Sequence, residues 1–567
     1  MAIKIDKTAL AQKINTLEGL DAETKSQLLE LLHERKRYGL IWEEKEEDVE
    51  ERLRNELPVL REVKERAIIA DDPEAPDHIL IEGDNLEALT TLTYTHENQI
   101  DVIYIDPPYN TGNKDFVYND RFVDADDEYR HSKWLSFMAK RLRIAKRLLS
   151  DKGVIFISID DNEQAALKLL CDEIFEEKNF VASPVRKRRK SQANLSKNIS
   201  TIHEYVLIYR KTELFELNKI QANIDASEYK NIDNDIRGAY KTMPCTNKGG
   251  TIYSIVTPTG KILTDEWRFK KETYLELLRD NRIVFPKNGE GKPRYKLFLS
   301  DKKESGVIAN SWWDDLESNQ EGALLLKNIL GTDGFNNPKP VGLIEHILQL
   351  SSSKFSTILD FFAGSGTTLH ATMQLNADDG GHRKCILVTN NENHICEEVT
   401  YERNKRVING YTTPKGEQIA GLRNNTLRYY RTDFVARNSS ATAKRELMRA
   451  ATDMLCIKND IYTEQPLFGN RKFRKDVLRY FADGSRAMLV IYTPDAIETV
   501  VEQLQTMQPA TPVIVYVFSL NDYAMDADFE TVADRVELCA LPAAILNAYR
   551  KVLPRKQQPT KSEEDAL

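Results

Sequence analysis

The chain of 567 residues is long enough for two to four domains, and its 41% hydrophobic and 29% charged residues are typical of a soluble globular protein. It has no apolar run near the roughly 18 residues of a membrane span and no signal-peptide layout at its start, so we expect a cytoplasmic protein with no membrane segment. Its six cysteines are scattered and form no C-x-x-C pair, so we expect neither a disulfide nor a metal site. The net charge of -9 is unevenly distributed, because residues 183–300 carry 23 Lys and Arg against 13 Asp and Glu, and such a basic region is typical of a localised phosphate-binding face.

Residues 1–75 are charged and have helical periodicity, with leucines recurring at helical spacing around residues 28–32 and 53–60. We interpret this region as a helical N-terminal arm. It is expected to pack on the body of the protein or on a partner, and the alternative is a solvated helical pair without a role.

Residues 77–89 predict a strand, a turn and a helix. Asp84 lies at the turn, where it can either cap the helix that begins near Leu86 or contact a ligand at the end of the strand. The sequence leaves both roles open.

The most informative stretch of the chain is residues 103–112. Residues 102–105 predict a buried strand, and Pro107 and Pro108 end it because neither can donate a hydrogen bond to a ladder. The strand therefore stops at Asp106, two proline rings and Tyr109.

This loop suits a particular chemistry. Asp106 and the carbonyl of Pro107 can accept hydrogen bonds from an exocyclic amine, and Tyr109 can stack on the ring that carries the amine. Acceptors placed against the amine favour the positive charge that develops on nitrogen as it attacks an electrophilic methyl group. The plain alternative is a βα loop whose aspartate caps the next helix.

Strand and helix patterns alternate beyond the loop, with helices expected at 134–149 and 163–175 and strands at 153–160 and 203–210. This alternation favours a parallel, doubly wound α/β sheet.

The densest positive run opens the basic region and comprises Arg186, Lys187, Arg188, Arg189 and Lys190. We interpret it as a contact to the DNA backbone rather than a solvated surface. In residues 211–335, regular periodicity fades while Lys and Arg alternate with aromatic residues. That interleaving is typical of DNA contact, but also of an ordinary β-rich insert.

The α/β pattern resumes with a helix starting near Pro340, a strand at 357–360, a loop at 361–368 that opens a helix, and a strand at 385–388. Gly364 and Gly366 would let the backbone approach a ligand at a helix N-terminus, and Glu392, one strand later, could hold ribose hydroxyls. A lone G-x-G is a common tight turn, but this context indicates an adenosine cofactor.

Residues 433–567 predict a small α/β module, with strands at 488–492, 513–518 and 536–539 and helices at 495–507 and 543–549. It contains no catalytic constellation, so we expect a docking or self-association role. No Walker-type motif occurs in the sequence, and the chain itself is not expected to hydrolyse ATP.

If the strands that end at Asp106 and Asp360 are neighbours at the switch point of the sheet, both loops face one crevice. Direct attack of an amine on a methyl donor held there would need neither a metal nor a nucleophilic cysteine.

The motif Asp106-Pro107-Pro108-Tyr109, followed far downstream by Phe362-x-Gly364-x-Gly366, is similar to the DNA amino-methyltransferases that use S-adenosylmethionine. Their order resembles the circularly permuted β class, with the catalytic motif first and the cofactor motif last. The longer strings 103–112, 337–340 and 360–368 resemble the modification subunit of type III restriction-modification systems.

The resemblance implies N6-adenine methylation of double-stranded DNA, with the base flipped into a pocket formed by Asp106, Pro107, Pro108 and Tyr109. It implies a homodimer that works beside a separate restriction or helicase subunit. It assigns the cofactor to Asp84, Asp106, Lys339, Asp360, Phe362, Gly364, Gly366, Thr367 and Glu392.

We therefore predict a doubly wound, permuted Rossmann-like methyltransferase domain with additions at both ends. Its parts are a helical arm (1–75), a catalytic part (76–210), a target-recognition insert (211–335), a cofactor part (336–432) and a C-terminal module (433–567). The alternatives are an adenine methyltransferase of another phage-defence system, a catalytically silent DNA-binding scaffold, and a methyltransferase for RNA or protein amides.

Overall fold

The computed structural model describes residue 25 and residues 42–554, apart from 44, 113–114, 119–120, 125, 192–198, 221–224, 287, 333–334, 439, 508, 510 and 521–522. The leucines expected on a helix around residues 28–32, and the tail beyond 554, lie outside the described residues. No helix in the described part is both long enough and apolar enough to cross a bilayer.

An 11-stranded mixed sheet forms the centre of the molecule, in the order β1-β20-β2-β17-β16-β3-β6-β9-β8-β15, with β7 beside β9. Its middle strands run parallel and comprise β20 (Thr426–Ala436), β2 (Asp77–Glu82), β17 (Lys384–Thr389), β16 (Thr357–Asp360), β3 (Ile100–Ile105) and β6 (Leu149–Ile159). The remaining strands extend the two edges and comprise β1 (Glu56–Glu62), β7 (Phe180–Ala182), β8 (Val185–Lys187), β9 (His203–Arg210) and β15 (Trp312–Trp313).

The connections reverse direction between β16 and β3, which are hydrogen-bonded neighbours with Leu359 opposite Ile103. From β3 the chain passes through α5 (Arg130–Leu148) to β6 on one side, and from β16 through α11 (Thr367–Asp379) to β17 on the other. Ligands of such sheets bind at this point, outside the carboxyl ends of the strands. The two strands that end at Asp106 and Asp360 are therefore neighbours, as the shared crevice requires.

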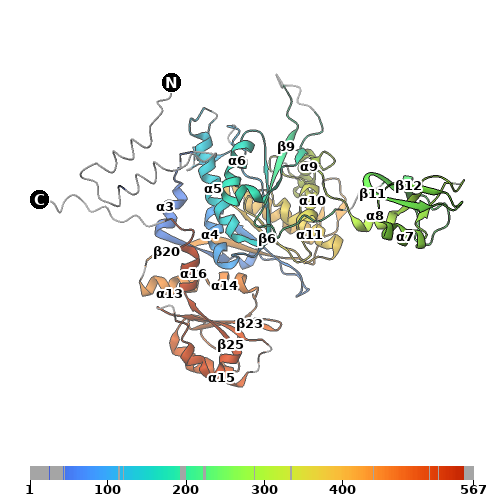
Figure 1. Ribbon diagram of the computed structural model, residues 1–567. Coiled ribbons are helices and arrows are strands. Elements are labelled where there is room, and N and C mark those ends of the chain that lie inside the picture. Colours follow the sequence, from blue (N-terminus) through green and yellow to red (C-terminus); the bar gives the residue numbers. More distant parts are fainter. Residues whose placement is uncertain are drawn as a thin grey trace.

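Helices cover both faces of the sheet (Figure 1). Alternate residues of β3 point to opposite faces, with Ile103 in one core and Val102 in the other. The first core includes α4 (Asn85–Thr95), α5 and α6 (Gln164–Cys171), and the second includes α9 (Asn319–Leu330), α10 (Val341–Ser351), α11 and α12 (Glu402–Asn409). Two short hairpins lie outside the large sheet, β4 (Val117–Tyr118) with β5 (Arg121–Phe122) and β18 (Tyr411–Thr412) with β19 (Gln418–Ile419).

The C-terminal region shares a core with the body. Its five-stranded sheet contains β21 (Glu464–Gln465), β22 (Leu478–Asp483), β23 (Arg486–Ile491), β24 (Val513–Phe518) and β25 (Val536–Leu541), with α15 (Ile497–Thr506) on one face. The helices α13 (Ala441–Ala450), α14 (Thr452–Asn459) and α16 (Ala543–Tyr549) join the core that contains α4. The Tyr549 hydroxyl donates a hydrogen bond to the Pro58 carbonyl at 2.7 Å, which ties α16 to the edge strand β1.

The insert lies apart from the body at the right of Figure 1. It contains β10 (Tyr240–Pro244), β11 (Thr246–Val256), β12 (Ile262–Trp267), α7 (Lys271–Arg279), β13 (Ile283–Val284), β14 (Arg294–Phe298) and α8 (Leu299–Ser305), around its own small core with Trp267 and Tyr274. The segments β15 and α9 also fall within residues 211–335, but β15 pairs with β8 and α9 packs in the second core of the body.

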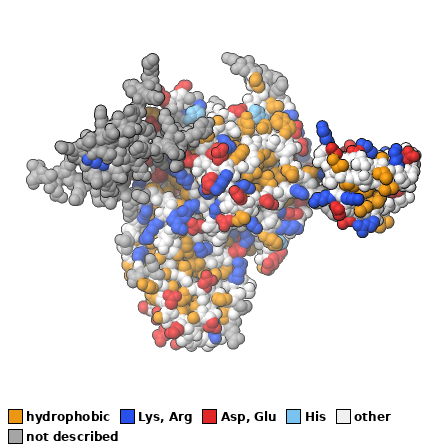
Figure 2. All heavy atoms as spheres, viewed as in Figure 1, with side chains coloured by type: hydrophobic (Ala, Val, Ile, Leu, Met, Phe, Trp, Pro, Cys, Tyr) orange, Lys and Arg blue, Asp and Glu red, His pale blue; other side chains and the backbone are white. Residues whose placement is uncertain are grey.

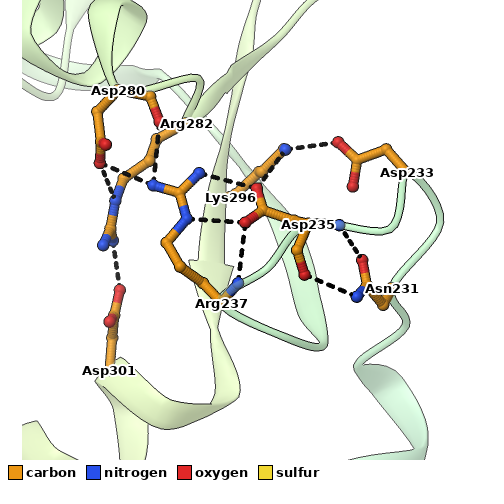
Figure 3. Close-up of polar contacts among 8 residues, drawn as sticks. All are labelled: Asn231, Asp233, Asp235, Arg237, Asp280, Arg282, Lys296 and Asp301. Carbon is orange, nitrogen blue, oxygen red and sulfur yellow. Dashed lines mark hydrogen bonds and ion pairs between the residues drawn. The ribbon is translucent and has the colours of Figure 1, made fainter.

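An ion-pair network ties together several segments of the insert (Figure 3). The buried Lys296 ammonium lies 2.9 Å from Asp235 and 2.5 Å from Asp233. Arg237 bridges Asp235 and Asp280, at 2.8 Å from each. The network therefore joins the loop before β10 to β14 and to the end of α7.

Replacing Lys296 by methionine is expected to loosen the insert alone. The substitution removes the cation that two carboxylates share, and leaves them facing each other. Hydrogen exchange in residues 225–306 should accelerate by about tenfold or more, while β3 and β16 keep their protection. Lys296→Arg, which retains the charge, is the control, and equal acceleration throughout the body would contradict a local role.

Candidate active site

One cavity of about 1230 Å³ receives both loops that the sequence singled out. Asp106, Pro107, Pro108 and Tyr109 line it from the end of β3, and Phe361, Phe362 and Gly364 line it from the end of β16. Asp84, Lys339 and Glu392 also line it, so most of the predicted site is brought together. Within the described ranges, no group of three or more His, Cys, Asp or Glu side chains is arranged to hold a metal ion.

Neighbouring side chains fix the Asp-Pro-Pro-Tyr loop from three directions. The Trp134 indole donates to the Pro108 carbonyl at 2.7 Å, and the Tyr109 hydroxyl donates to Glu204 at 3.2 Å. Buried Asn110, which has a positive φ of 56°, donates from its amide to Glu163 at 2.5 Å. Among the described residues none donates to the carbonyl of Pro107, which directly precedes these anchored positions.

Lys339 connects the Asp106 loop to the glycine loop that follows β16. Its ammonium donates to Asp106 Oδ2 at 2.8 Å and to the Tyr109 hydroxyl at 3.0 Å. Its backbone carbonyl accepts a hydrogen bond from Thr367 Oγ1 at 3.1 Å. From the sequence we expected Lys339 to hold the cofactor; it lines the cavity, and its ammonium lies against the Asp106 carboxylate.

Two carboxylates and two cations form a buried network below the loop. Burial raises the pKa of Asp106, the Glu204 carboxylate raises it further, and Lys339 lowers it. Although burial alone would raise the pKa of Glu204, Lys339 and Arg186 hold it below its ordinary value. Asp106 Oδ1 is buried and lies 2.8 Å from the Lys339 nitrogen, yet it accepts no well-oriented hydrogen bond. The Asp106 side chain as a whole is 28% exposed and lines the cavity, so the carboxylate can still face a ligand.

The structure divides the positive run that was expected to contact DNA. Arg188 and Arg189 line the cavity, and exposed Lys190 pairs with Glu321 at 2.6 Å. For Arg186 the expected contact to the DNA backbone is wrong. Its guanidinium is fully buried and lies 2.5 Å from Glu204, out of reach of a DNA phosphate. Its role is to neutralise Glu204.

The glycine loop after β16 has the conformation that only glycine adopts easily. Gly364 and Gly366 have φ values of 47° and 73°, and a Cβ on Gly366 would lie 2.4 Å from the Asn404 amide nitrogen. Asp360 holds the loop by accepting hydrogen bonds from the Phe362 N–H at 3.0 Å and the Thr368 hydroxyl at 2.5 Å. Burial raises the pKa of Asp360 to about 7.

Only some of the residues predicted to bind the cofactor line the cavity. Phe362, Gly364 and Glu392 line the cavity, whereas Asp360 and the segment 366–367 lie behind its surface and shape the loop. Asp84 caps α4 by accepting from the Leu86 N–H at 2.7 Å, so its capping role is confirmed, and it also lines the cavity.

Three residues of the site were not recognised in the sequence, namely Trp134, Glu163 and Glu204, and Arg186 was assigned to the DNA backbone instead. Glu163, Arg186 and Glu204 are charged side chains that the fold buries, and Trp134 is an aromatic residue on an otherwise ordinary amphipathic helix. The one available signal was Glu204, an acid at the start of an apolar strand, since a buried carboxylate requires a cationic partner.

Comparison with known proteins agrees with this geometry. A family model described as DNA methylase matches residues 100–408, which is more than half of the chain. The chain is 38% identical over 341 residues to the type III restriction-modification enzyme StyLTI Mod subunit of Salmonella typhimurium, covering 55% of this chain and 52% of that protein. It is 34% identical to the type II methyltransferase M.KpnI of Klebsiella pneumoniae, over 58% of this chain and 84% of that protein.

Among solved structures, the cytosine-N4-specific PvuII DNA methyltransferase aligns with a TM-score of 0.34 and 11% identity, over 58% of this chain and 88% of its own. The chain spans about half the length of the StyLTI Mod subunit. The family match and the similarity to M.KpnI show that the chain belongs to the DNA methylase family.

Proposed function

We propose that the chain is a DNA methyltransferase that transfers a methyl group from S-adenosylmethionine to the N6 amino group of adenine. The observation that carries the proposal is the single cavity shared by the Asp106 loop and the glycine loop of residues 361–366. A donor held by one loop and an acceptor held by the other would lie in contact, and this proximity is a large part of such catalysis.

The cavity residues suit S-adenosylmethionine. Gly364 presents backbone to the cavity without a side chain, and the carboxylates of Asp84 and Glu392 are acceptors for hydroxyl and amino groups. When bound, the cofactor supplies the electrophilic methyl group. The permuted chain order, with β3 before β16 and the insert between them, supports assignment to the β class.

The protein's contribution to the reaction is electrostatic. The Asp106 carboxylate and the Pro107 carbonyl can both accept from the adenine amine, which stabilises the positive charge that develops on its nitrogen. The Tyr109 ring, anchored through its hydroxyl to Glu204, offers a surface for the base. After transfer, Asp106 is the nearest carboxylate to receive the proton that the amine loses.

The substrate is proposed to be double-stranded DNA with the adenine flipped out of the helix. Arg188 and Arg189 lie at the β8 side of the cavity, where they can contact phosphates beside the flipped base. Lys and Arg side chains are spread over the visible face of the insert (Figure 2), which supports its assignment to target recognition.

The chain is further proposed to act as a modification subunit of a type III system, as a homodimer with a separate restriction subunit. The relation to the StyLTI Mod subunit supports this assignment. Co-purification of a helicase-like chain, and the mass of the purified complex, test it directly.

The proposed reaction is tested by its product. Purified protein is incubated with S-adenosylmethionine and mixed-sequence DNA, which is then digested to nucleosides and examined by mass spectrometry. The expected product is N6-methyl-2′-deoxyadenosine, and sequencing of the methylated DNA gives the recognition site. N4-methylcytosine as the product would contradict the proposed base, and DNA binding without any methylation would favour a silent scaffold.

A further inference from the structure

The N-terminal arm reaches the cavity of the active site. Glu47, Asp48 and Val49, at the start of α3 (Asp48–Asn55), line it beside Asp84 and Asn85. These arm residues precede the segment 100–408 that the family model matches. From the sequence we expected the arm only to pack on the body or on a partner.

A buried ion pair holds this part of the arm. Glu47 Oε1 lies 2.9 Å from the Arg141 guanidinium, and the two residues are only 7% and 1% exposed. Arg141 also donates to Asn85, and its guanidinium carbon lies 3.6 Å from the centre of the Phe137 ring. Arg141 thus joins the arm to the residues that follow β2.

Further contacts hold the arm along α5. The Lys140 ammonium donates to Glu50 at 2.5 Å and to the Lys45 carbonyl at 2.8 Å. The Lys45 N–H donates to the Ser136 hydroxyl at 3.0 Å. The segment 45–50 is therefore held against α5, and residues 47–49 within it form a fixed wall of the cavity.

The strand order tells which end of the cavity the arm closes. Asp84 follows β2 and Glu392 follows β17, on one side of the switch point, whereas Asp160 follows β6 and Arg188 follows β8 on the other side. Neighbouring strands are about 4.8 Å apart, so β2 and β8 lie far from each other along the sheet edge. Arg141 pairs with Glu47 of the arm and donates to Asn85, which follows β2. The arm therefore lies at the β2–β17 end of the cavity, away from the end where DNA is proposed to enter.

We propose that residues 47–49 form one wall of the pocket for the adenosine part of S-adenosylmethionine, an inference that rests on the proposed use of this cofactor. Phe362, whose ring lies 5.9 Å from that of Phe137, supplies aromatic surface at this end, and Val49 supplies aliphatic surface. Asp48 and Asp84 supply oxygen acceptors for amino or hydroxyl groups. A purine nucleoside fits this combination of apolar surface and acceptors.

The test is cofactor binding by the full chain carrying Glu47→Gln, measured by calorimetry with S-adenosylmethionine. The dissociation constant should rise by about tenfold or more, because the substitution breaks the buried pair that holds the wall. The affinity for DNA should stay within about twofold, since the arm lies at the other end. Glu46→Gln is the matched control, because this side chain is 71% exposed, pairs with Arg54 and does not line the cavity.

Hydrogen exchange gives a second measurement that does not depend on the variant. Adding S-adenosylmethionine to the unmodified protein should slow exchange in residues 45–50. If the unmodified protein binds the cofactor, but Glu47→Gln binds it equally well and residues 45–50 gain no protection, the inference is overturned and the proposed function stands. If the unmodified protein does not bind the cofactor at all, the proposed function itself fails.

Discussion

Replacing Asp106 by alanine is expected to reduce methyl transfer by up to about 10³-fold, while cofactor binding survives. The substitution removes the carboxylate that faces the amine as positive charge develops, and losing one such preorganised group typically costs about 10²–10³-fold. The variant should fold, because Lys339 remains within 3.7 Å of Glu204 and keeps a negative partner. The glycine loop of residues 360–368 keeps its own contacts, because Asp360 still accepts from the Phe362 N–H and the Thr368 hydroxyl.

Single-turnover transfer from S-adenosylmethionine to DNA measures the chemical step, and calorimetry measures cofactor affinity. Asp106→Asn is the matched control, since it keeps an oxygen acceptor but loses the charge. Its rate should fall between those of the alanine variant and the unmodified protein. Full activity of Asp106→Ala would refute the role assigned to this carboxylate.

The two loops of the active site could be predicted because each carries its local structure in its own residues. Two prolines end β3 whatever surrounds them. A glycine is needed at position 366, because the chain enters α11 there with a φ of 73°. Strands with continuous apolar runs were also predicted correctly. The strands predicted at residues 203–210 and 513–518 have the same bounds as β9 and β24. In these segments the local pattern and the tertiary burial agree.

The buried charges below the loop could not be predicted, because they depend on pairing between strands. Arg186 on β8 lies directly opposite Glu204 on β9, in an antiparallel pair that places both side chains inside. A run of five basic residues shows how much charge is present but not which side chain points inward. The period of two along β8 buries Arg186 and turns its neighbour Lys187 to the other face.

The contribution of Lys339 was also underestimated from sequence, for a different reason. It precedes Pro340 in a segment with no regular period, and 233 residues separate it from the carboxylate it binds. Only the sheet order, which places β16 beside β3, brings the two together. Its effect on the reaction is therefore the prediction that depends most on the structure.

Replacing Lys339 by methionine is expected to slow methyl transfer by about 10²-fold near neutral pH and to change its pH dependence. Burial already raises the pKa of Asp106, and the Lys339 ammonium opposes that shift. Without the ammonium, the pKa of Asp106 rises further, so a smaller fraction of this carboxylate is ionised at a given pH. Transfer by the variant should therefore increase as the pH is raised, over a range where the unmodified protein has already reached its plateau.

The measurement is the single-turnover rate from about pH 6 to about pH 9, the range in which such a shift is visible. Lys339→Arg keeps the positive charge, and its pH profile should remain close to that of the unmodified protein. Cofactor affinity should change little in either variant, because Thr367 contacts Lys339 only through its backbone carbonyl. A methionine variant whose rate is lower by the same factor at every pH would mean that Lys339 only positions the loop. If the rate of the methionine variant instead rises at a higher pH than that of the unmodified protein, and arginine restores the original profile, the charge of Lys339 sets the ionisation of Asp106.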